Sequence, residues 1–110
     1  EQNALEATRL NPNMARAQGR LGEAYFRQNN YTEAIEALGK AVTMYGRATD
    51  LNARFFNMLA QAYIRDDLNN CTLATPLFEQ VLEATVNELI VAAANEGLVE
   101  CRRASLGTAP

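Results

Sequence analysis

Histidine is missing from the 110 residues, and cysteine occurs only at positions 71 and 101. Histidine is the commonest general base and a frequent metal ligand, so its absence argues against an enzyme and against a zinc site built on the two thiols. The sequence also has no phosphate-binding glycine loop and no nucleophile motif. We therefore expect no catalytic residues, no metal and no cofactor.

Long apolar runs and a strong excess of one charge are missing too. The longest apolar run, Leu89–Ala94, is far short of the ~20 residues that cross a bilayer, so we expect no membrane span in this segment. The net charge of −3 is unlike that of a strongly basic nucleic-acid binder, so we expect no nucleic-acid partner. No secretion signal is visible, and the sequence opens on Glu1 rather than Met, which favours a piece of a longer protein.

Helix-forming residues fill the long stretches between the few prolines, at positions 12, 76 and 110. Strand-like alternation is missing, so the sequence predicts an all-α fold. The apolar spacing predicts helices at 1–10, 13–28, 32–45, 51–65, 74–85 and 88–105. We place the start of the fifth helix at 74 because proline is best tolerated in a first turn.

Turn and cap residues mark the ends of these helices. Asn29-Asn30 predicts a tight turn, because Asn tolerates left-handed backbone angles. The predicted caps are Thr32, Asp50, Thr72 or Thr75, and Asn87 at N-termini, and Gly46 at a C-terminus. In the helix 13–28, the residues at spacings of three and four predict an inward stripe of Ala17, Leu21, Ala24, Tyr25 and Gln28.

A helix pair recurs along the chain. Leu21, Gly22 and Tyr25 return 38 residues later as Leu59, Ala60 and Tyr63, and Ala34, Leu38 and Ala41 return 40 residues later as Ala74, Phe78 and Val81. Recurrence at this scale is typical of a helical solenoid. Relative to a 34-residue repeat, the spacing implies about four extra residues near Thr49–Asn52, or about one helical turn.

These residues resemble the tetratricopeptide repeat family, whose pattern is W-x2-L-G-x2-Y, then A-x3-F, then P. The first copy matches at Leu21, Gly22, Tyr25, Ala34 and Ala41, with Gln18, Leu38 and Gly46 replacing Trp, Phe and Pro. The second matches at Leu59, Tyr63, Ala74 and Phe78, with Phe56 at the Trp position and Ala60 replacing Gly.

The resemblance implies a short α-solenoid of antiparallel helix pairs, forming a right-handed superhelix. It divides a single domain, residues 1–110, into five parts: the end of a preceding repeat (1–12), a first full repeat (13–48), a second, degenerate repeat (49–86), a capping helix (87–105) and a tail (106–110).

The family's first helices line a concave groove, which implies a protein or peptide partner, and an acidic one because arginine forks suit carboxylates. The alternative is a solvated helix face on which Arg16, Arg20 and Glu23 pair among themselves. Gly19, Met58 and Ile64 also map onto groove positions, while Glu33, Glu36, Glu79 and Glu83 are expected on outer faces. The expected partner-binding residues are Arg16, Arg20, Glu23, Phe26, Arg27, Arg54, Asn57, Gln61 and Arg65.

The sequence is compatible with a second role and with two states of its cysteines. The apolar ends of the solenoid would also suit end-to-end self-association, so a structural role competes with partner binding. Cys71 and Cys101 are interpreted as one loop thiol and one small buried side chain, which suits the cytoplasm. If they are paired instead, a periplasmic or other extracytoplasmic compartment is expected.

Overall fold

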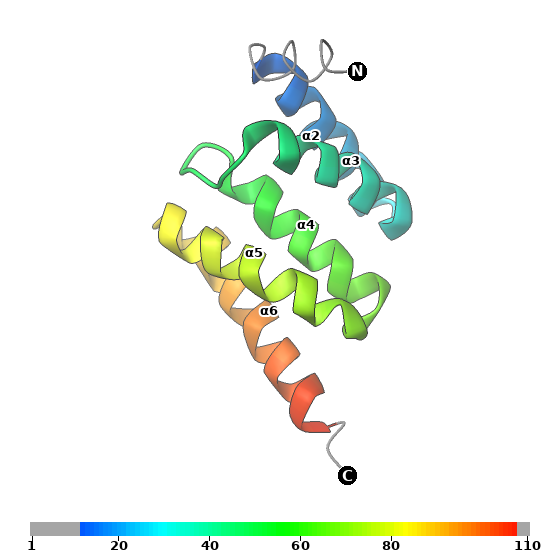
Figure 1. Ribbon diagram of the computed structural model, residues 1–110, viewed down its shortest axis with the longest axis vertical. Helices are drawn as coiled ribbons and strands as arrows, with labels where there is room; N and C mark the ends of the chain where they lie inside the picture. Colours follow the sequence, from blue (N-terminus) through cyan, green and yellow to red (C-terminus); the bar gives the residue numbers. More distant parts are fainter. Residues whose placement is uncertain (1–11, 108–110) are drawn as a thin grey trace.

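The computed structural model describes the backbone of residues 12–107 and the side chains of residues 13–106. This part of the chain is helical, with connections and one short 3₁₀ turn, as the sequence predicts (Figure 1). The predicted helix 1–10 lies outside the described residues. The elements follow in the order α2 (Pro12–Arg27), α3 (Tyr31–Tyr45), α4 (Ala53–Asp66), η1 (Leu68–Asn70), α5 (Cys71–Ala84) and α6 (Glu88–Gly107).

Helix α4 is the centre of the fold and contacts each of α2, α3, α5 and α6. Its neighbouring residues Phe55 and Phe56 point about 100° apart and are both buried. They belong to two core clusters, one on each side of the helix. Phe55 packs with Ala34, Leu38, Leu59 and Ala62. Phe56 packs with Ala53, Ala60, Ile64, Ala74, Phe78, Val81, Ala94 and Cys101.

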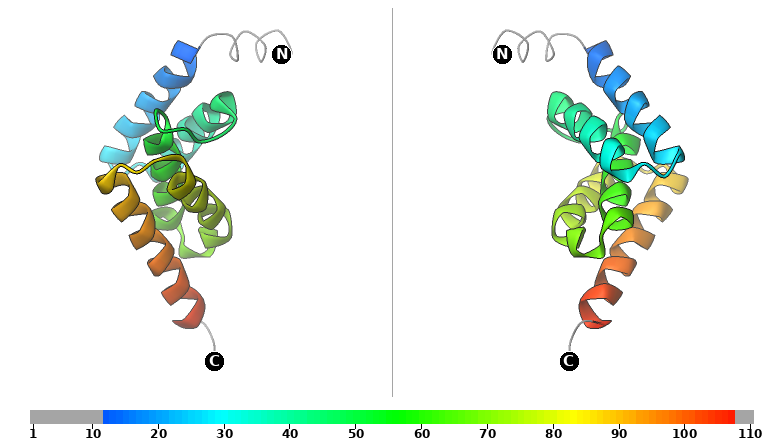
Figure 2. Two further views of the ribbon diagram at one scale, coloured as in Figure 1. Left: turned by 90° about the vertical axis from the view of Figure 1, so that its left-hand side faces the viewer. Right: turned by 90° about the vertical axis from the view of Figure 1, so that its right-hand side faces the viewer.

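Helix α4 lies between two sets of helices. Figure 2 shows α3 and α5 on one side of the molecule and α2 and α6 on the other, with α4 between. Consecutive helices pack together, α2 with α3 and α4 with α5, through short connections. This is the stack of helix pairs that the sequence predicts. We call α3 and α5 the outer layer. It carries the predicted exposed acids Glu33, Glu36, Glu79 and Glu83.

The buried face of α2 is not the predicted stripe. Its buried residues are Ala15, Gly19 and Gly22, and a Cβ at Gly22 would collide with the Leu38 side chain of α3. The helix thus packs through small residues that allow close approach. The predicted stripe is exposed, apart from the half-buried Tyr25: Ala17, Leu21, Ala24 and Gln28.

Several predicted helix ends are confirmed. Asn29 has a φ of 64° and Gly46 a φ of 89°, so both have the positive φ expected of a turn and a C-cap, and the Gly46 N–H donates to the Val42 carbonyl at the end of α3. The side-chain oxygen of Asn87 accepts hydrogen bonds from the backbone N–H groups of Leu89 and Ile90, each at 3.1 Å, and caps α6. Helix α6 runs to Gly107, two residues beyond its predicted end.

Other predicted caps are wrong. Helix α3 begins at Tyr31 and α4 begins at Ala53, so Thr32 and Asp50 do not stand at their N-caps. Asp50 instead accepts a hydrogen bond from the Thr85 hydroxyl at 2.5 Å. Neither Thr72 nor Thr75 caps α5, since both lie inside it.

Helix α5 begins at Cys71, three residues before its predicted start, because the 3₁₀ turn η1 leads directly into it. The Asp67 carboxylate accepts from the backbone N–H of Asn69 at 2.9 Å, and the Asn70 side chain donates to the Tyr63 carbonyl at 3.0 Å. Pro76 therefore lies beyond the first turn and cannot donate to the carbonyl four residues earlier.

Candidate partner-binding surface

The residues predicted to bind a partner lie along α2 and α4, two helices in direct contact. On α4, Arg54 and Arg65 are exposed, and Asn57 and Gln61 are half-buried. Most other residues of this helix belong to the two core clusters or pack against them. Ile64 is the exception among the mapped positions. It is only 5% exposed and belongs to the core cluster of Phe56, so its assignment to the groove is wrong.

Gly19 brings α2 close to the first turn of α4. A Cβ at this position would come within 2.7 Å of the Phe55 ring, so only a residue without a side chain lets the ring lie against α2. The exposed Arg16 and Arg20 flank Gly19 on α2, and Arg54 precedes Phe55 on α4. The glycine therefore places three guanidinium groups around one region of the surface.

The three arginines share a hollow of about 370 Å³, which we call the arginine hollow. No acidic residue is among its described lining residues. Sequence reasoning found the three arginines but missed the others, although the extra residues near Thr49–Asn52 were a signal that this connection departs from the repeat. The hollow is lined by Arg16 and Arg20 of α2, Tyr45 of α3, Thr49, Leu51 and Asn52 of the connection, and Arg54 and Phe55 of α4.

The connection that closes the hollow is fixed by Asn52, which is only 4% exposed. Its side-chain oxygen accepts from the backbone N–H of Thr49 at 2.6 Å, and its side-chain nitrogen donates to the Arg47 carbonyl at 3.1 Å. Both polar ends of the buried amide are thus satisfied. The connection is held in one conformation by a residue whose burial makes these hydrogen bonds costly to lose.

Aromatic rings hold one of the arginines in place. The Arg54 guanidinium lies 4.6 Å from the centroid of the Phe55 ring, a cation–π distance. The Tyr45 ring stacks on Phe55 with a centroid separation of 6.1 Å and an interplanar angle of 13°. Arg54 is therefore positioned by a buried ring rather than by a carboxylate.

The other end of α2 carries a different arrangement. Arg27 pairs with Glu23 at 2.7 Å, so Glu23 neutralises Arg27 and not Arg16 or Arg20. The Arg27 side chain is 76% exposed, which makes this a surface ion pair of small energetic value. Beside it, the Phe26 ring meets Tyr31 edge-on at 5.6 Å, and the Arg65 guanidinium lies 5.6 Å from the Phe26 centroid.

Gln61 and Asn57 occupy the middle of α4. The Gln61 side chain donates to the Ala93 carbonyl of α6 at 3.0 Å, so this predicted binding residue ties two helices together. The side-chain oxygen of Asn57 is buried and has no hydrogen-bond partner among the described residues.

Within residues 13–106, most basic side chains of this surface have no acidic partner. Two ion pairs join described residues, Glu23 with Arg27 and Glu36 with Lys40. Arg20, Arg54 and Arg65 take part in neither. Arg16 donates to the Asn13 side chain at 3.4 Å. The predicted pairing of Arg16 and Arg20 with Glu23 is thus absent in the described part of the chain.

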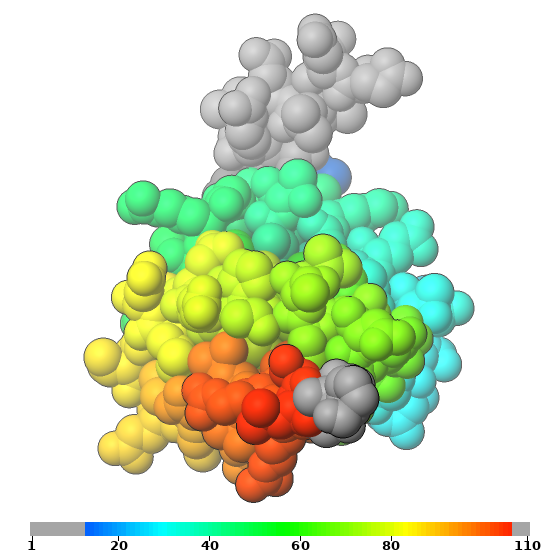
Figure 3. Space-filling model, turned by 60° about the horizontal axis from the view of Figure 1, so that its bottom comes forward, coloured from blue at the N-terminus to red at the C-terminus, as the bar shows by residue number. Residues whose placement is uncertain are grey.

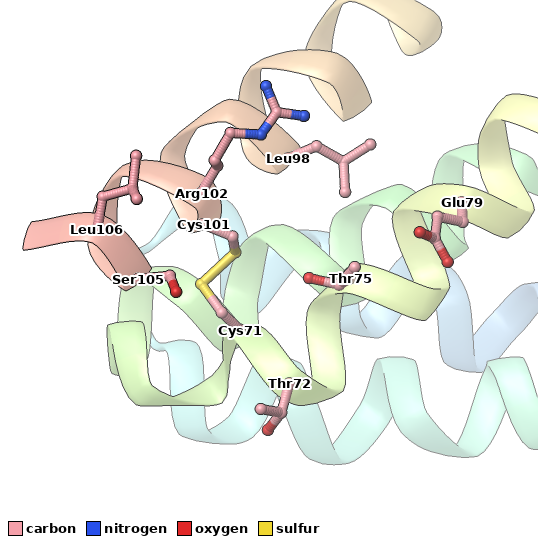
Figure 4. Close-up of a pocket in the computed structure, with 9 residues that line it drawn as sticks. All are labelled: Cys71, Thr72, Thr75, Glu79, Leu98, Cys101, Arg102, Ser105 and Leu106. Atoms are coloured by element: carbon pink, nitrogen blue, oxygen red, sulfur yellow. A yellow bond between two sulfur atoms is a disulfide. The ribbon is translucent and has the colours of Figure 1, made fainter. Parts of the chain in front are cut away.

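Cys71 and Cys101 form a disulfide bond between α5 and α6 (Figure 4). The interpretation of two unpaired cysteines is therefore wrong. Cys71 opens α5 and the partly wound segment before it places the residue beside α6, an arrangement that sequence spacing did not resolve. Figure 3 shows the surface that α5 and α6, the two helices joined by this bond, form side by side.

A second hollow, of about 460 Å³, lies beside the disulfide. Figure 4 shows Thr75 and Glu79 along its α5 side and Leu98 and Arg102 along its α6 side. One carboxylate and one guanidinium thus line it, in contrast to the arginine hollow.

The described residues contain neither a cluster suited to a metal ion nor a membrane-spanning helix. In this part of the chain, no group of three or more Cys, Asp or Glu side chains is placed to hold a metal ion. No helix in it has both the length and the apolar character that crossing a membrane requires.

Comparison with protein families matches residues 2–50 to the tetratricopeptide repeat. The match covers the first helical pair described above and the arginines of α2. Comparisons with curated proteins and with solved structures found no match.

Proposed function

We propose that the chain binds an acidic peptide or partner domain, because residues 2–50 match the tetratricopeptide repeat, a non-catalytic type of module that generally mediates protein–protein interaction. The binding surface is the one formed by α2 and α4. It includes the arginine hollow and extends toward Phe26 and Arg65.

The observation that carries this proposal is the arginine hollow. Arg20 and Arg54 line a concave site with Arg16 and have no carboxylate partner within the described structure. Guanidinium groups form strong, bidentate hydrogen bonds with carboxylates, so an acidic partner would supply the missing acceptors. The acidic side chains of α3 and α5 lie in the outer layer, which leaves this surface basic although the chain is acidic overall.

The test begins with peptides selected from a random library by the wild-type protein. We expect them to be enriched in Asp and Glu. Replacing four arginines of the surface by glutamate should weaken their binding by at least about tenfold, because each reversal puts like charges together. The reversed residues are Arg16, Arg27, Arg54 and Arg65. Binding is measured by fluorescence anisotropy of the labelled peptides.

A matched control reverses four exposed basic residues elsewhere, which gives the same net charge. These are Lys40, Arg47, Arg102 and Arg103; Arg47 belongs to the connection before α4, but it lines a separate hollow beside Gln80 and Glu83 of α5 and not the arginine hollow. The control variant should keep its affinity to within about twofold, since distant exposed charges are largely screened. Selected peptides that bind both variants equally well would rule out this surface as the binding site.

The disulfide supports an oxidising setting for the interaction. Disulfides persist in the periplasm and other extracytoplasmic spaces and are rare in the cytosol. We therefore place the proposed interaction in such a compartment, in contrast to the cytoplasmic setting expected for unpaired cysteines.

End-to-end self-association is the second candidate function. Exposed apolar side chains favour it, with Met14 and Leu21 each 45% exposed on α2, Leu73 53% exposed on α5 and Leu106 70% exposed on α6. Stacking of repeat ends would bury such residues. Light scattering across a wide range of concentrations tests this: self-association predicts a rising molar mass, and a constant monomer mass excludes it.

A further inference from the structure

The arginine hollow is more basic than a single carboxylate requires. Arg16, Arg20 and Arg54 bring three positive charges to one hollow, and none of the described residues that line it is acidic. We infer that this hollow binds a doubly charged oxygen anion carried by the partner's side chains, either two adjacent carboxylates or one phosphate. The inference rests on the proposed function and names the group that anchors the partner.

The charge of the three arginines favours a dianion over a single carboxylate. Three guanidinium groups in one hollow repel one another, and a single carboxylate would neutralise only one of them. A phosphate carries nearly two charges at neutral pH and offers three acceptor oxygens. Two adjacent carboxylates offer the same charge and four oxygens. Either group gives each guanidinium an acceptor, which one carboxylate with two oxygens does not.

Preorganisation is the second argument. Arg54 lies over the Phe55 ring, which is itself held by Tyr45 and by the close approach at Gly19. Asn52 fixes the connection that closes the hollow. Side chains held before binding lose less freedom when the ligand arrives. The site is thus arranged to receive an anion with little rearrangement of Arg54 and the connection.

The volume of the arginine hollow and its difference from the hollow beside the disulfide also favour a dianion. A hollow of about 370 Å³ is near the small end of ligand sites, which span about 300–1,000 Å³. It suits one or two side chains rather than a whole helix. The hollow beside the disulfide includes Arg102 but also Glu79, so the same argument does not assign it a dianion.

The experiment uses short probes with both ends blocked, so that no terminal carboxylate contributes. The probes are N-acetyl-Asp-Asp-amide, N-acetyl-Asp-Asn-amide and N-acetyl-phosphoserine-amide, titrated into the isotope-labelled full chain. Binding is followed by NMR through the side-chain Nε–H signals of Arg16, Arg20 and Arg54. We expect at least one dianionic probe to bind at least tenfold more tightly than the monoanionic Asp-Asn probe.

The variants test the location. Arg20→Gln and Arg54→Gln should each weaken binding of the dianionic probe at least fivefold, while Arg102→Gln should leave it unchanged. Tight binding of the Asp-Asp probe alone identifies an acidic segment, and tight binding of the phosphoserine probe alone identifies a phosphorylated one. Equal binding of the Asp-Asp, phosphoserine and Asp-Asn probes, or equal losses with Arg20→Gln and Arg102→Gln, would overturn the inference.

Failure of this inference differs from failure of the proposed function. If no probe binds at the hollow but the four-arginine reversal still abolishes binding of the selected peptides, the dianion site is rejected and the interaction surface stands. If the reversal has no effect while a dianionic probe binds at Arg54, the anion site stands without the proposed peptide surface.

Discussion

A variant carrying Cys71→Ser and Cys101→Ala is expected to unfold about 15 °C below the wild-type protein. The two cysteines are separated by 30 residues in sequence. In the chain-entropy view, a cross-link closing a loop of that length stabilises the fold by about 3.6 kcal/mol at 25 °C. For a domain of 110 residues, an unfolding entropy of about 2.1 cal/mol/K per residue converts this into the stated shift. Differential scanning calorimetry measures it.

The loss should be concentrated in α6. Among the described residues of this helix, the buried ones are the small Ala94, Gly97 and Cys101, while the larger Ile90 and Leu98 are only partly buried against the core. Besides the disulfide, a hydrogen bond from the Gln61 side chain of α4 to the Ala93 carbonyl holds this helix in place. Hydrogen exchange should therefore accelerate more in α6 than in α3 when the disulfide is removed, because weakly packed elements open first.

A thiol reductant provides the control. It should lower the melting temperature of the wild type toward that of the double variant and leave the double variant unchanged. If thiol titration shows complete reduction and the wild type melts at its original temperature, the disulfide does not stabilise the fold. The sign of the shift is set by the unfolded chain, which gains freedom when the cross-link is broken.

The helix pattern was predictable because periodicity reports burial. Leu38 of α3 and Leu59 of α4, two apolar positions of the recurring helix pair, are both buried. Spacing alone failed on α2, where the buried face is built from Ala15, Gly19 and Gly22. A glycine has no side chain to contribute to an apolar stripe, so a search for apolar spacing selected the opposite face.

Local cap rules failed where a distant residue competed. Asp50 has the side chain of a good N-cap, but it bonds to Thr85, which is 35 residues away in sequence. The cap position before α4 is taken by Asn52, whose side chain instead fixes the connection through Thr49 and Arg47. A rule that reads only four neighbouring residues cannot anticipate such contacts.

The candidate site was predictable as a set of residues but not as an arrangement. The resemblance to the repeat family assigned the arginines of α2 and α4 to one groove. It did not separate Arg27, which Glu23 neutralises, from Arg20 and Arg54, which have no acidic partner in the described structure. Nor did it show that Gln61 is engaged with α6. These distinctions depend on contacts between elements, which spacing within one helix does not encode.

Gly97→Val is expected to destabilise the protein by about 3 kcal/mol, at the upper end of the usual range for overpacking. Gly97 lies in α6 against the completely buried Phe78 ring of α5, and even an added Cβ would come within 2.6 Å of the ring atom Cε2. The ring cannot move aside without disturbing the core cluster around Phe56. Urea unfolding followed by circular dichroism measures the difference in free energy.

The same substitution at Gly39 separates packing from helix propensity. Gly39 lies inside α3, and nothing lies within 4 Å of a Cβ added there, so Gly39→Val should change stability by less than about 0.5 kcal/mol.

Phe78→Leu removes the ring atoms that the new side chain at position 97 would meet, so adding Gly97→Val in that background should cost at least about 1 kcal/mol less than in the wild type. Equal costs in the two backgrounds would show that the ring does not set the spacing of α5 and α6. The close approach at Gly97 would then serve the disulfide, whose Cα atoms are 5.5 Å apart, and not the core.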